Sequence, residues 1–347
     1  MSKTENTTGT VVLELDGASI LNTNEVAEMK KDITTNRDDI AQLKSYIGLP
    51  PSEPLPDLVF TVDGKCYPPH LAISSGVQSI GANAYQNFPQ LKSVRFSDTV
   101  TTIGTSAFQN CDGINKVQFS DSVTLIGMNA FQDCTGFAEL TLPVNTTTIE
   151  KYAFSGCSGI TGKMVFPETL KFMGDGAFAG CINITEVELP KNKFETGFDC
   201  FSNTGIREIR IPGYFEILKG GFVKDMPNLT AIYIENGVEQ LQDSFASNCP
   251  LLTDLYLPNS INKLGGIHVF SNCPLLKNVT FEQGFNCSHL NLSASKLFTV
   301  ETLVSLFEAL ADRTELEPNT LILGGSNLAK LTDEQKAIAT NKNWVLV

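Results

Sequence analysis

The chain has 347 residues, of which 42% are hydrophobic, so it holds enough apolar material for a sizeable folded core. Its 38 acidic residues outnumber the 25 basic residues and give a formal net charge of −13. An acidic chain without a Lys/Arg cluster argues against nucleic acid and anionic membranes as partners. No apolar run approaches the roughly 20 residues of a transmembrane helix, so we expect no membrane insertion.

The N-terminal segment, residues 1–48, begins with a short predicted strand at 11–15 and continues into a heptad pattern. Side chains spaced alternately three and four residues apart occupy Val26, Met29, Ile33, Asn36, Ile40, Leu43 and Ile47. This a/d spacing predicts a short coiled coil. A single amphipathic helix packed on the end of the remaining chain is the alternative.

Asn36 falls at a d position, as does Asn22 fourteen residues earlier. Asparagine at d resembles the trimeric coiled coils of viral fibres and trimeric adhesins. Residues 33–48 also resemble the short coiled coils of phage tail-fibre and baseplate proteins. These resemblances imply a homotrimer that attaches to other virion proteins through its N-terminus. The first ten residues lack the basic and apolar regions of a secretory signal, which suggests either a trimmed chain or release by another route, such as inside a virion.

Residues 49–58 contain four prolines and predict a stiff, extended linker. Residues 60–67 predict a hairpin that turns at Asp63-Gly64. We interpret residues 59–79 as an N-terminal cap that covers the open edge of the next domain.

Residues 80–290 contain a pattern that recurs about nine times with a period near 23 residues. The copies begin at Ile80, Ile103, Ile126, Ile149, Met173, Thr196, Leu218, Leu241 and Leu264. A fixed period of this length predicts a solenoid, because a single unit cannot bury its apolar face alone. Within each copy, an L-x-x-V-x-F/L run alternates apolar and polar residues and predicts one half-buried strand per repeat. Stacked strands would form one long parallel sheet.

A phenylalanine recurs in the first half of the copies, and we expect these rings to stack as one aromatic column in the core. The column would contain Phe108, Phe131, Phe154, Phe178, Phe201, Phe222, Phe245 and Phe270, with Tyr85 in the first copy. The full motif, I-G-x-x-A-F-x-x-C-x-x-L-x-x-V-x-L-P, resembles the BspA-like leucine-rich repeat, a type named after a bacterial surface adhesin. This resemblance implies a mostly β repeat solenoid of the α/β type. The pattern degenerates at residues 191–227, which leaves open whether the solenoid bends there or the sequence has merely drifted.

Six of the nine cysteines share one repeat position and predict a stack of buried thiols. They are Cys111, Cys134, Cys157, Cys181, Cys249 and Cys273. Occasional disulfides remain an alternative, whereas spacings near 23 residues do not match zinc ligand pairs. Cys66, Cys200 and Cys287 lie outside this register.

Residues 291–347 predict an α/β cap that closes the solenoid. Apolar residues at helical spacing predict a helix over 299–312, followed by a strand at 319–325. A capping box at Thr332–Gln335 then predicts a second helix, and residues 344–347 predict a last strand. Trp344, the only tryptophan, should lie in the core.

No nucleophile, metal or phosphate-binding motif occurs in its required context, so we expect no enzymatic activity, no cofactor and no metal. Exposed positions between the two strand anchors form the candidate ligand-binding face: Arg95, Gln118, Thr141, Val165, Glu188, Arg210, Tyr233, Tyr256 and Thr280. An adjacent row contains Ser93, Lys116, Glu139, Lys163, Glu186, Glu208, Ala231, Asp254 and Asn278. For any single residue, an ordinary solvated sheet is the alternative.

Tyr233 and Tyr256 lie one repeat apart and predict an aromatic platform, with Arg210 beside it and Asp254 in reach. The leading hypothesis is a phage tail fibre or baseplate component that binds a host cell-surface glycan or protein. The second hypothesis is a bacterial cell-surface or secreted adhesin. The third is a structural virion decoration protein.

Overall fold

The computed structural model describes residues 2–5, 11–14, 59–60, 66–67, 70–266 and 268–347. Strands β1 (Ser2–Glu5) and β2 (Val11–Glu14) pair antiparallel, which confirms the predicted strand near residue 11. Strands β3 (Val59–Phe60) and β4 (Cys66–Tyr67) also pair antiparallel, as the hairpin prediction requires. The predicted coiled coil at 26–47 and the linker at 49–58 lie outside the described residues.

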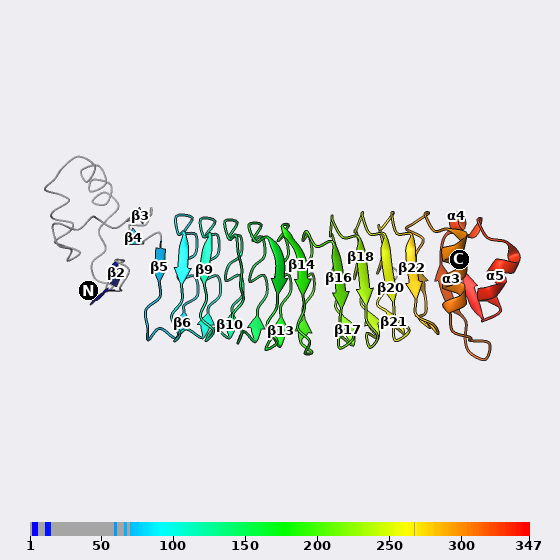
Figure 1. The fold of residues 1–347 in the computed structure, drawn as a ribbon, viewed down its shortest axis with the longest axis horizontal. Helices are drawn as coiled ribbons and strands as arrows, with labels where there is room; N and C mark the ends of the chain where they lie inside the picture. The colour runs from blue at the N-terminus through cyan, green and yellow to red at the C-terminus, as the bar shows by residue number, and fades with distance from the viewer. Residues whose placement is uncertain (1, 6–10, 15–58, 61–65, 68–69, 267) are drawn as a thin grey trace.

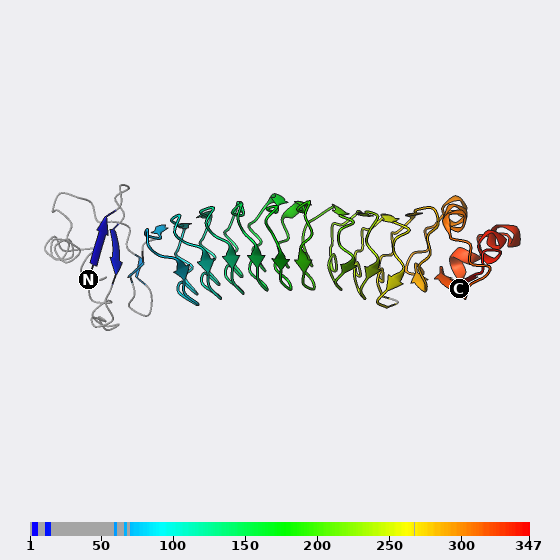
Figure 2. The same cartoon turned by 90° about the horizontal axis from the view of Figure 1, so that it is seen from below.

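From residue 70 the chain forms an extended, mostly β solenoid whose turns follow one another along the long axis of the molecule (Figures 1 and 2). Two parallel ladders run along it. The first, which we call the strand ladder, contains β5 (His70–Ala72), β7 (Ser93–Arg95), β9 (Lys116–Gln118), β12 (Gly162–Val165), β14 (Ile184–Glu188), β16 (Glu208–Ile211), β18 (Ala231–Ile234), β20 (Asp254–Leu257) and β22 (Asn278–Phe281). Its first strand, β5, lies within the segment for which we predict a cap.

The second ladder, which we call the short ladder, is built from two-residue strands. It contains β6 (Ser79–Ile80), β8 (Thr102–Ile103), β10 (Leu125–Ile126), β11 (Thr148–Ile149), β13 (Phe172–Met173), β15 (Glu195–Thr196), β17 (Ile217–Leu218), β19 (Gln240–Leu241) and β21 (Lys263–Leu264). The prediction of one strand per repeat is therefore wrong. A strand of two residues is too short to display the alternation by which a strand is recognised in sequence.

The expectation of one continuous sheet is also wrong, because the strand ladder is interrupted twice. Between β9 and β12, pairing is reduced to a single bridge from Lys116 to Glu139. The second interruption affects both ladders, since β14 does not pair with β16 and β15 does not pair with β17. In Figure 1 this junction appears as a break in the run of strands.

The second junction lies within residues 191–227, where the repeat pattern degenerates. Backbone hydrogen bonds across it are long, at 3.3 Å from the Arg207 amide to the Thr185 carbonyl and 3.3 Å from Asp199 to Gly220. The bond that corresponds to the second of these, from Tyr152 to Asp175 inside a regular stretch, measures 2.9 Å. The repeat that starts at Thr196 is also one residue shorter than the repeat that starts at Ile103. The degenerate segment thus interrupts the pairing of the solenoid.

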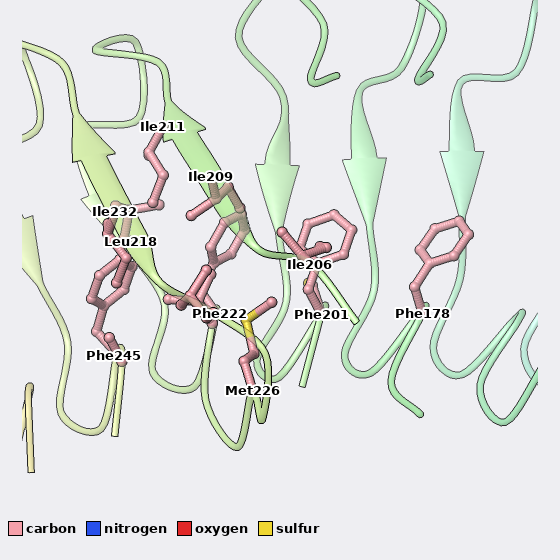
Figure 3. Close-up of a cluster of buried hydrophobic side chains, with 14 of the residues drawn as sticks. Phe178, Phe201, Ile206, Ile209, Ile211, Leu218, Phe222, Met226, Ile232 and Phe245 are labelled. Atoms are coloured by element: carbon pink, nitrogen blue, oxygen red, sulfur yellow. The ribbon is translucent and has the colours of Figure 1, made fainter. Parts of the chain in front are cut away.

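The aromatic column is present, with its eight phenylalanines buried and Tyr85 partly buried, but its rings change orientation. From Tyr85 to Phe201, successive rings stack with centroids 5.1–6.1 Å apart and planes within 19° of parallel. The Phe222 ring then stands at 84° to Phe201 (Figure 3). The Phe270 ring stands at 84° to Phe245.

This change of orientation arises because Phe222 and Phe245 occupy the position that alanine has in other repeats. In regular repeats the amide of the phenylalanine donates to the carbonyl of the next repeat's alanine, as from Phe108 to Ala130. The same bond here runs from Val223 to Phe245. The prediction that all eight phenylalanines are equivalent is therefore wrong for these two. The exchange is tolerated because both positions of the Ala-Phe pair are fully buried.

The predicted stack of thiols is confirmed, since the six cysteines in register are buried and free. Each thiol donates to a backbone carbonyl of the preceding repeat, as Cys134 does to Phe108 at 3.1 Å and Cys157 to Phe131 at 2.9 Å. Cys200 lies four residues before the thiol position of its repeat, in the alanine site, and it too is buried. Thr204 takes the vacated thiol position in that repeat and donates to Phe201.

The buried thiols predict a loss of stability in alkaline solution. Burial raises the pKa of Cys111, Cys181 and Cys287 from 9.0 to about 12. Their stabilising contribution is complete below the unfolded pKa and is lost as the pH rises from about 9 towards 12, because the unfolded chain releases these protons first. We expect the free energy of unfolding to fall by roughly 1 kcal/mol for each of these thiols between about pH 8 and about pH 10. Urea unfolding at the two pH values measures this difference. A Cys111→Ala/Cys181→Ala variant should show a shallower decline, and an unchanged slope would contradict this assignment.

The C-terminal cap contains α3 (Val300–Ala309), α4 (Gly325–Leu328), α5 (Asp333–Thr340) and a parallel sheet of β23 (Leu290–Asn291), β24 (Asn319–Ile322) and β25 (Trp344–Leu346). The predicted capping box at Thr332 is present. Trp344 is 2% exposed and donates to the Ala311 carbonyl. The Lys342 ammonium donates to the carbonyls of Phe307, Glu308 and Leu310 and so closes the C-terminus of α3. The short helix α4 was not predicted.

Candidate ligand-binding face

The strand ladder places the predicted face residues in register along the solenoid. Arg95 pairs with Gln118, and Val165 pairs with Glu188. Beyond the junction, Arg210 pairs with Tyr233, Tyr233 with Tyr256, and Tyr256 with Thr280. Thr141 is exposed but follows the isolated bridge at Glu139 and belongs to no strand. The row is therefore divided by the two interruptions rather than continuous.

The face before the junction is dominated by an exposed cluster of charges. The Lys163 ammonium lies 3.0 Å from the Glu186 carboxylate and 2.8 Å from that of Glu188. Hydrogen bonding to Glu188 and then Glu186 raises the pKa of Lys163, and hydrogen bonding to Lys163 lowers the pKa of Glu188. Because all three side chains are exposed, water and salt screen these ion pairs. Val165, which is 54% exposed, adds an isolated apolar surface next to them.

The face beyond the junction holds what we call the tyrosine patch, comprising Arg210, Tyr233, Asp254 and Tyr256. The Arg210 guanidinium carbon lies 4.6 Å from the centroid of the Tyr233 ring, within the range of a cation–π contact. Both tyrosines are half-buried, so their rings lie partly against the sheet. The guanidinium is thus held in place above a ring that remains partly open to solvent.

Asp254 is positioned by two neighbours that sequence reasoning did not include in the site. Its Oδ1 accepts a hydrogen bond of 2.8 Å from the Asn278 amide, and its Oδ2 accepts one from the Thr253 hydroxyl. Asn278 lies in the next repeat, directly paired with Asp254. The sequence does place an Asp and an Asn at the same position of successive repeats, and this pattern could have indicated the hydrogen bond between them. These bonds orient the carboxylate on the same strand as Tyr256.

Within the described ranges, no three His, Cys, Asp or Glu side chains are grouped so that they could hold a metal ion. Among the helices in the same ranges, none has both the length and the apolar character to cross a bilayer. His70, one of three histidines, lies with Nδ1 2.8 Å from the Ser93 hydroxyl.

A solenoid with parallel ladders and a repeat near 23 residues defines a leucine-rich repeat protein. The sequence model described as the BspA type leucine rich repeat region (6 copies) matches residues 64–181 and 161–277. These ranges cover more than half of the chain. The protein therefore belongs to the BspA-type leucine-rich repeat family.

Solved leucine-rich repeat structures are similar to this chain at low identity. A leucine rich cell surface protein from Faecalibacterium prausnitzii is 19% identical, with a TM-score of 0.49, over 83% of this chain and 92% of its own. A leucine-rich repeat protein from Bacteroides ovatus is 20% identical, with a TM-score of 0.39, over 84% and 91%. The leucine-rich repeat protein of T. pallidum is 21% identical, with a TM-score of 0.35, over 44% and 89%. Curated proteins gave no match.

Proposed function

We propose that this protein is a non-enzymatic adhesion protein of the bacterial surface or its surroundings, and that the tyrosine patch makes its principal contact. Membership of a repeat family named after a surface adhesin supports the class of function. The single observation that carries the choice of site is the Arg210 guanidinium held over the Tyr233 ring. Tyrosine and arginine are enriched among the residues that dominate binding energies.

The composition of the patch fits a polar ligand with a flat face. The half-buried rings of Tyr233 and Tyr256 offer contact area to a ligand. Binding would cost little side-chain entropy, because each ring is already partly fixed against the sheet. The ordered carboxylate of Asp254 accepts hydrogen bonds, and Arg210 donates them. A cell-surface glycan or a protein loop with exposed backbone groups meets these requirements.

The virion hypothesis rests on the heptad at residues 26–47, which lies outside the described residues. It therefore stands as the second candidate, either as a receptor-binding tail component or as a decoration protein that contacts only virion proteins. A mass measurement by light scattering separates the possibilities. A trimer would support the fibre-like arrangement, and a monomer would remove its main argument.

A double Tyr233→Ala/Tyr256→Ala variant tests the tyrosine patch. The labelled wild-type chain is first applied to a panel of immobilised glycans and extracellular matrix proteins, and the strongest binder becomes the test surface. We expect the double variant to lose about 30-fold or more in affinity for it, because truncating two central contacts removes about 2 kcal/mol or more.

Gln118→Ala provides the matched control, since Gln118 lies on the same face before the junction and is exposed. Its affinity should remain within about two-fold of wild type, as expected for a contact away from the binding centre. Circular dichroism and thermal unfolding would establish that both variants remain folded. Wild-type affinity in the double variant would overturn the assignment of the patch.

A further inference from the structure

Tyr152 holds an unusual backbone conformation on a different surface of the solenoid, at the turn before the buried Ala153-Phe154 pair. Its φ is 56°, in the left-handed region that bulky residues rarely adopt. The corresponding positions of the neighbouring repeats are occupied by Asn129, Gly176 and Asp199, all with similar φ. Asparagine, glycine and aspartate tolerate this conformation, whereas tyrosine does so at a cost in free energy.

The Tyr152 ring lies over Gly176 of the next repeat and remains 45% exposed. A Cβ atom added to Gly176 would overlap the Cε1 and Cδ1 atoms of the ring, so the absence of a side chain there makes room for it. One face of the ring thus packs on Gly176, and the side chain remains partly open to solvent. Strain that the surrounding structure maintains is often associated with a functional position.

A second exposed aromatic ring, Phe198, lies two repeats from Tyr152 along the same turn. Backbone hydrogen bonds from Tyr152 to Asp175 and from Gly176 to Phe198 establish this register. Phe198 is 47% exposed, and the Lys219 ammonium lies 5.6 Å from its ring centroid. The ring leans towards Gly220, where an added Cβ would lie 3.6 Å from its Cδ1 atom. Each ring therefore lies against a glycine of the following repeat.

Polar groups lie between the two rings. The Lys151 ammonium forms an ion pair of 2.6 Å with Asp175, whose other oxygen accepts the Phe198 amide at 3.0 Å. Hydrogen bonding to Lys151 lowers the pKa of Asp175, so it is charged at neutral pH. We call this surface, made of Lys151, Tyr152, Asp175, Phe198 and Lys219, the turn face.

From this arrangement we infer that the turn face is a second binding site, for an extended, neutral β-1,4-linked glycan. The backbone positions that carry the rings are two repeats apart, or about 10 Å along the solenoid at two strand spacings. Alternate sugars of such a glycan repeat at nearly this distance with the same face presented. The apolar faces of two such sugars would stack on Tyr152 and Phe198. Hydroxyl groups of the intervening sugar would donate to Asp175 and accept from Lys151.

Charge and shape favour this occupant over a second copy of the chain or a charged polymer. The Lys151–Asp175 ion pair is internally balanced, so an anionic glycan would meet only the single charge of Lys219 beside Phe198. A second copy would bring another net charge of −13, and like charges oppose such association. The turn face does not include residues of the strand ladder. A negative result for the turn face can therefore be distinguished from a negative result for the tyrosine patch.

Titration calorimetry with soluble oligosaccharides tests the inference. The probes are the β-1,4-linked hexamers of glucose, N-acetylglucosamine and mannose, with the α-1,4-linked glucose hexamer as the linkage control. We expect the wild type to bind at least one β-1,4-linked hexamer and to bind the α-linked hexamer far more weakly. Binding of none of the three, or equal binding of the α-linked hexamer, would overturn the proposal.

Two substitutions separate ring stacking from general effects on folding. Tyr152→Asn and Phe198→Ala should each weaken binding about tenfold or more, while Tyr152→Asn should raise the melting temperature because asparagine adopts the left-handed conformation more readily. Ile182→Ala, at a residue with a similar exposure of 48% outside the turn face, and Tyr233→Ala/Tyr256→Ala should both retain binding. Wild-type binding by Tyr152→Asn, or a lower melting temperature for it, would contradict the inference.

Discussion

Phe154→Ala is expected to lower the free energy of unfolding by about 3–5 kcal/mol. The ring is fully buried and stacks between Phe131 at 5.4 Å and Phe178 at 5.2 Å, with planes 3° and 14° from parallel. Truncation therefore opens a cavity at the interfaces with both neighbouring repeats. Because a solenoid repeat is stabilised mainly by its neighbours, the loss affects the cooperativity of the whole array as well as one contact.

Urea unfolding followed by circular dichroism measures this effect. Val165→Ala is the matched control. Val165 lies on β12 of the same repeat as Phe154, but its side chain is 54% exposed. Its free energy of unfolding should remain within about 0.5 kcal/mol of wild type. A loss below about 1 kcal/mol for Phe154→Ala would contradict the role of the stacked rings in holding the repeats together.

Gly237→Ala is expected to destabilise the protein by about 2 kcal/mol or more. Its φ of 114° is one that side-chain-bearing residues rarely adopt. The space is also closed, because an added Cβ would overlap the carbonyl oxygen of Gly213 in the preceding repeat. The turn can move away from this oxygen only if the two repeats, which lie directly beyond the junction, separate.

Gly76→Ala separates these two causes. Gly76 occupies the equivalent turn before the short ladder and has a φ of 96°, yet an added Cβ there would meet nothing within 4 Å. This variant carries the backbone strain alone, and we expect a loss of about 1 kcal/mol. Thermal unfolding of both variants measures the difference, and equal losses would show that the close approach of Gly213 has no effect.

Much of the fold could be predicted because the apolar pattern repeats. Each copy carries the same anchors, so an error in one copy is corrected by the others, and the positions of the strand ladder, the thiols and the regular part of the aromatic column follow. The helices and strands at the C-terminal end were accessible through local signals, as at the Thr332 capping box. The exchange of Phe222 and Val223 was less accessible, because both residues are apolar and the spacing changes by one position only.

Parts of both proposed binding surfaces depended on contacts that a linear pattern does not contain. Tyr233 and Tyr256 could be placed on one face, but not the guanidinium over Tyr233 or the amide that orients Asp254. Phe198 is anchored by a backbone bond to a carboxylate of the previous repeat. Such details arise from the relative positions of side chains in adjacent turns.

The sequence by itself determined that this chain is a repeat solenoid, because a 23-residue recurrence of apolar anchors can bury its core only by stacking. It also indicated which residues face solvent on the strand ladder, since the two-residue alternation of a strand leaves one side outward, although Ala231 in the adjacent row is buried. Only the tertiary structure decided where the ladders separate and which exposed side chains meet. Those outcomes depend on the register between turns, which is set by packing and hydrogen bonds across repeats rather than by any residue's own preference.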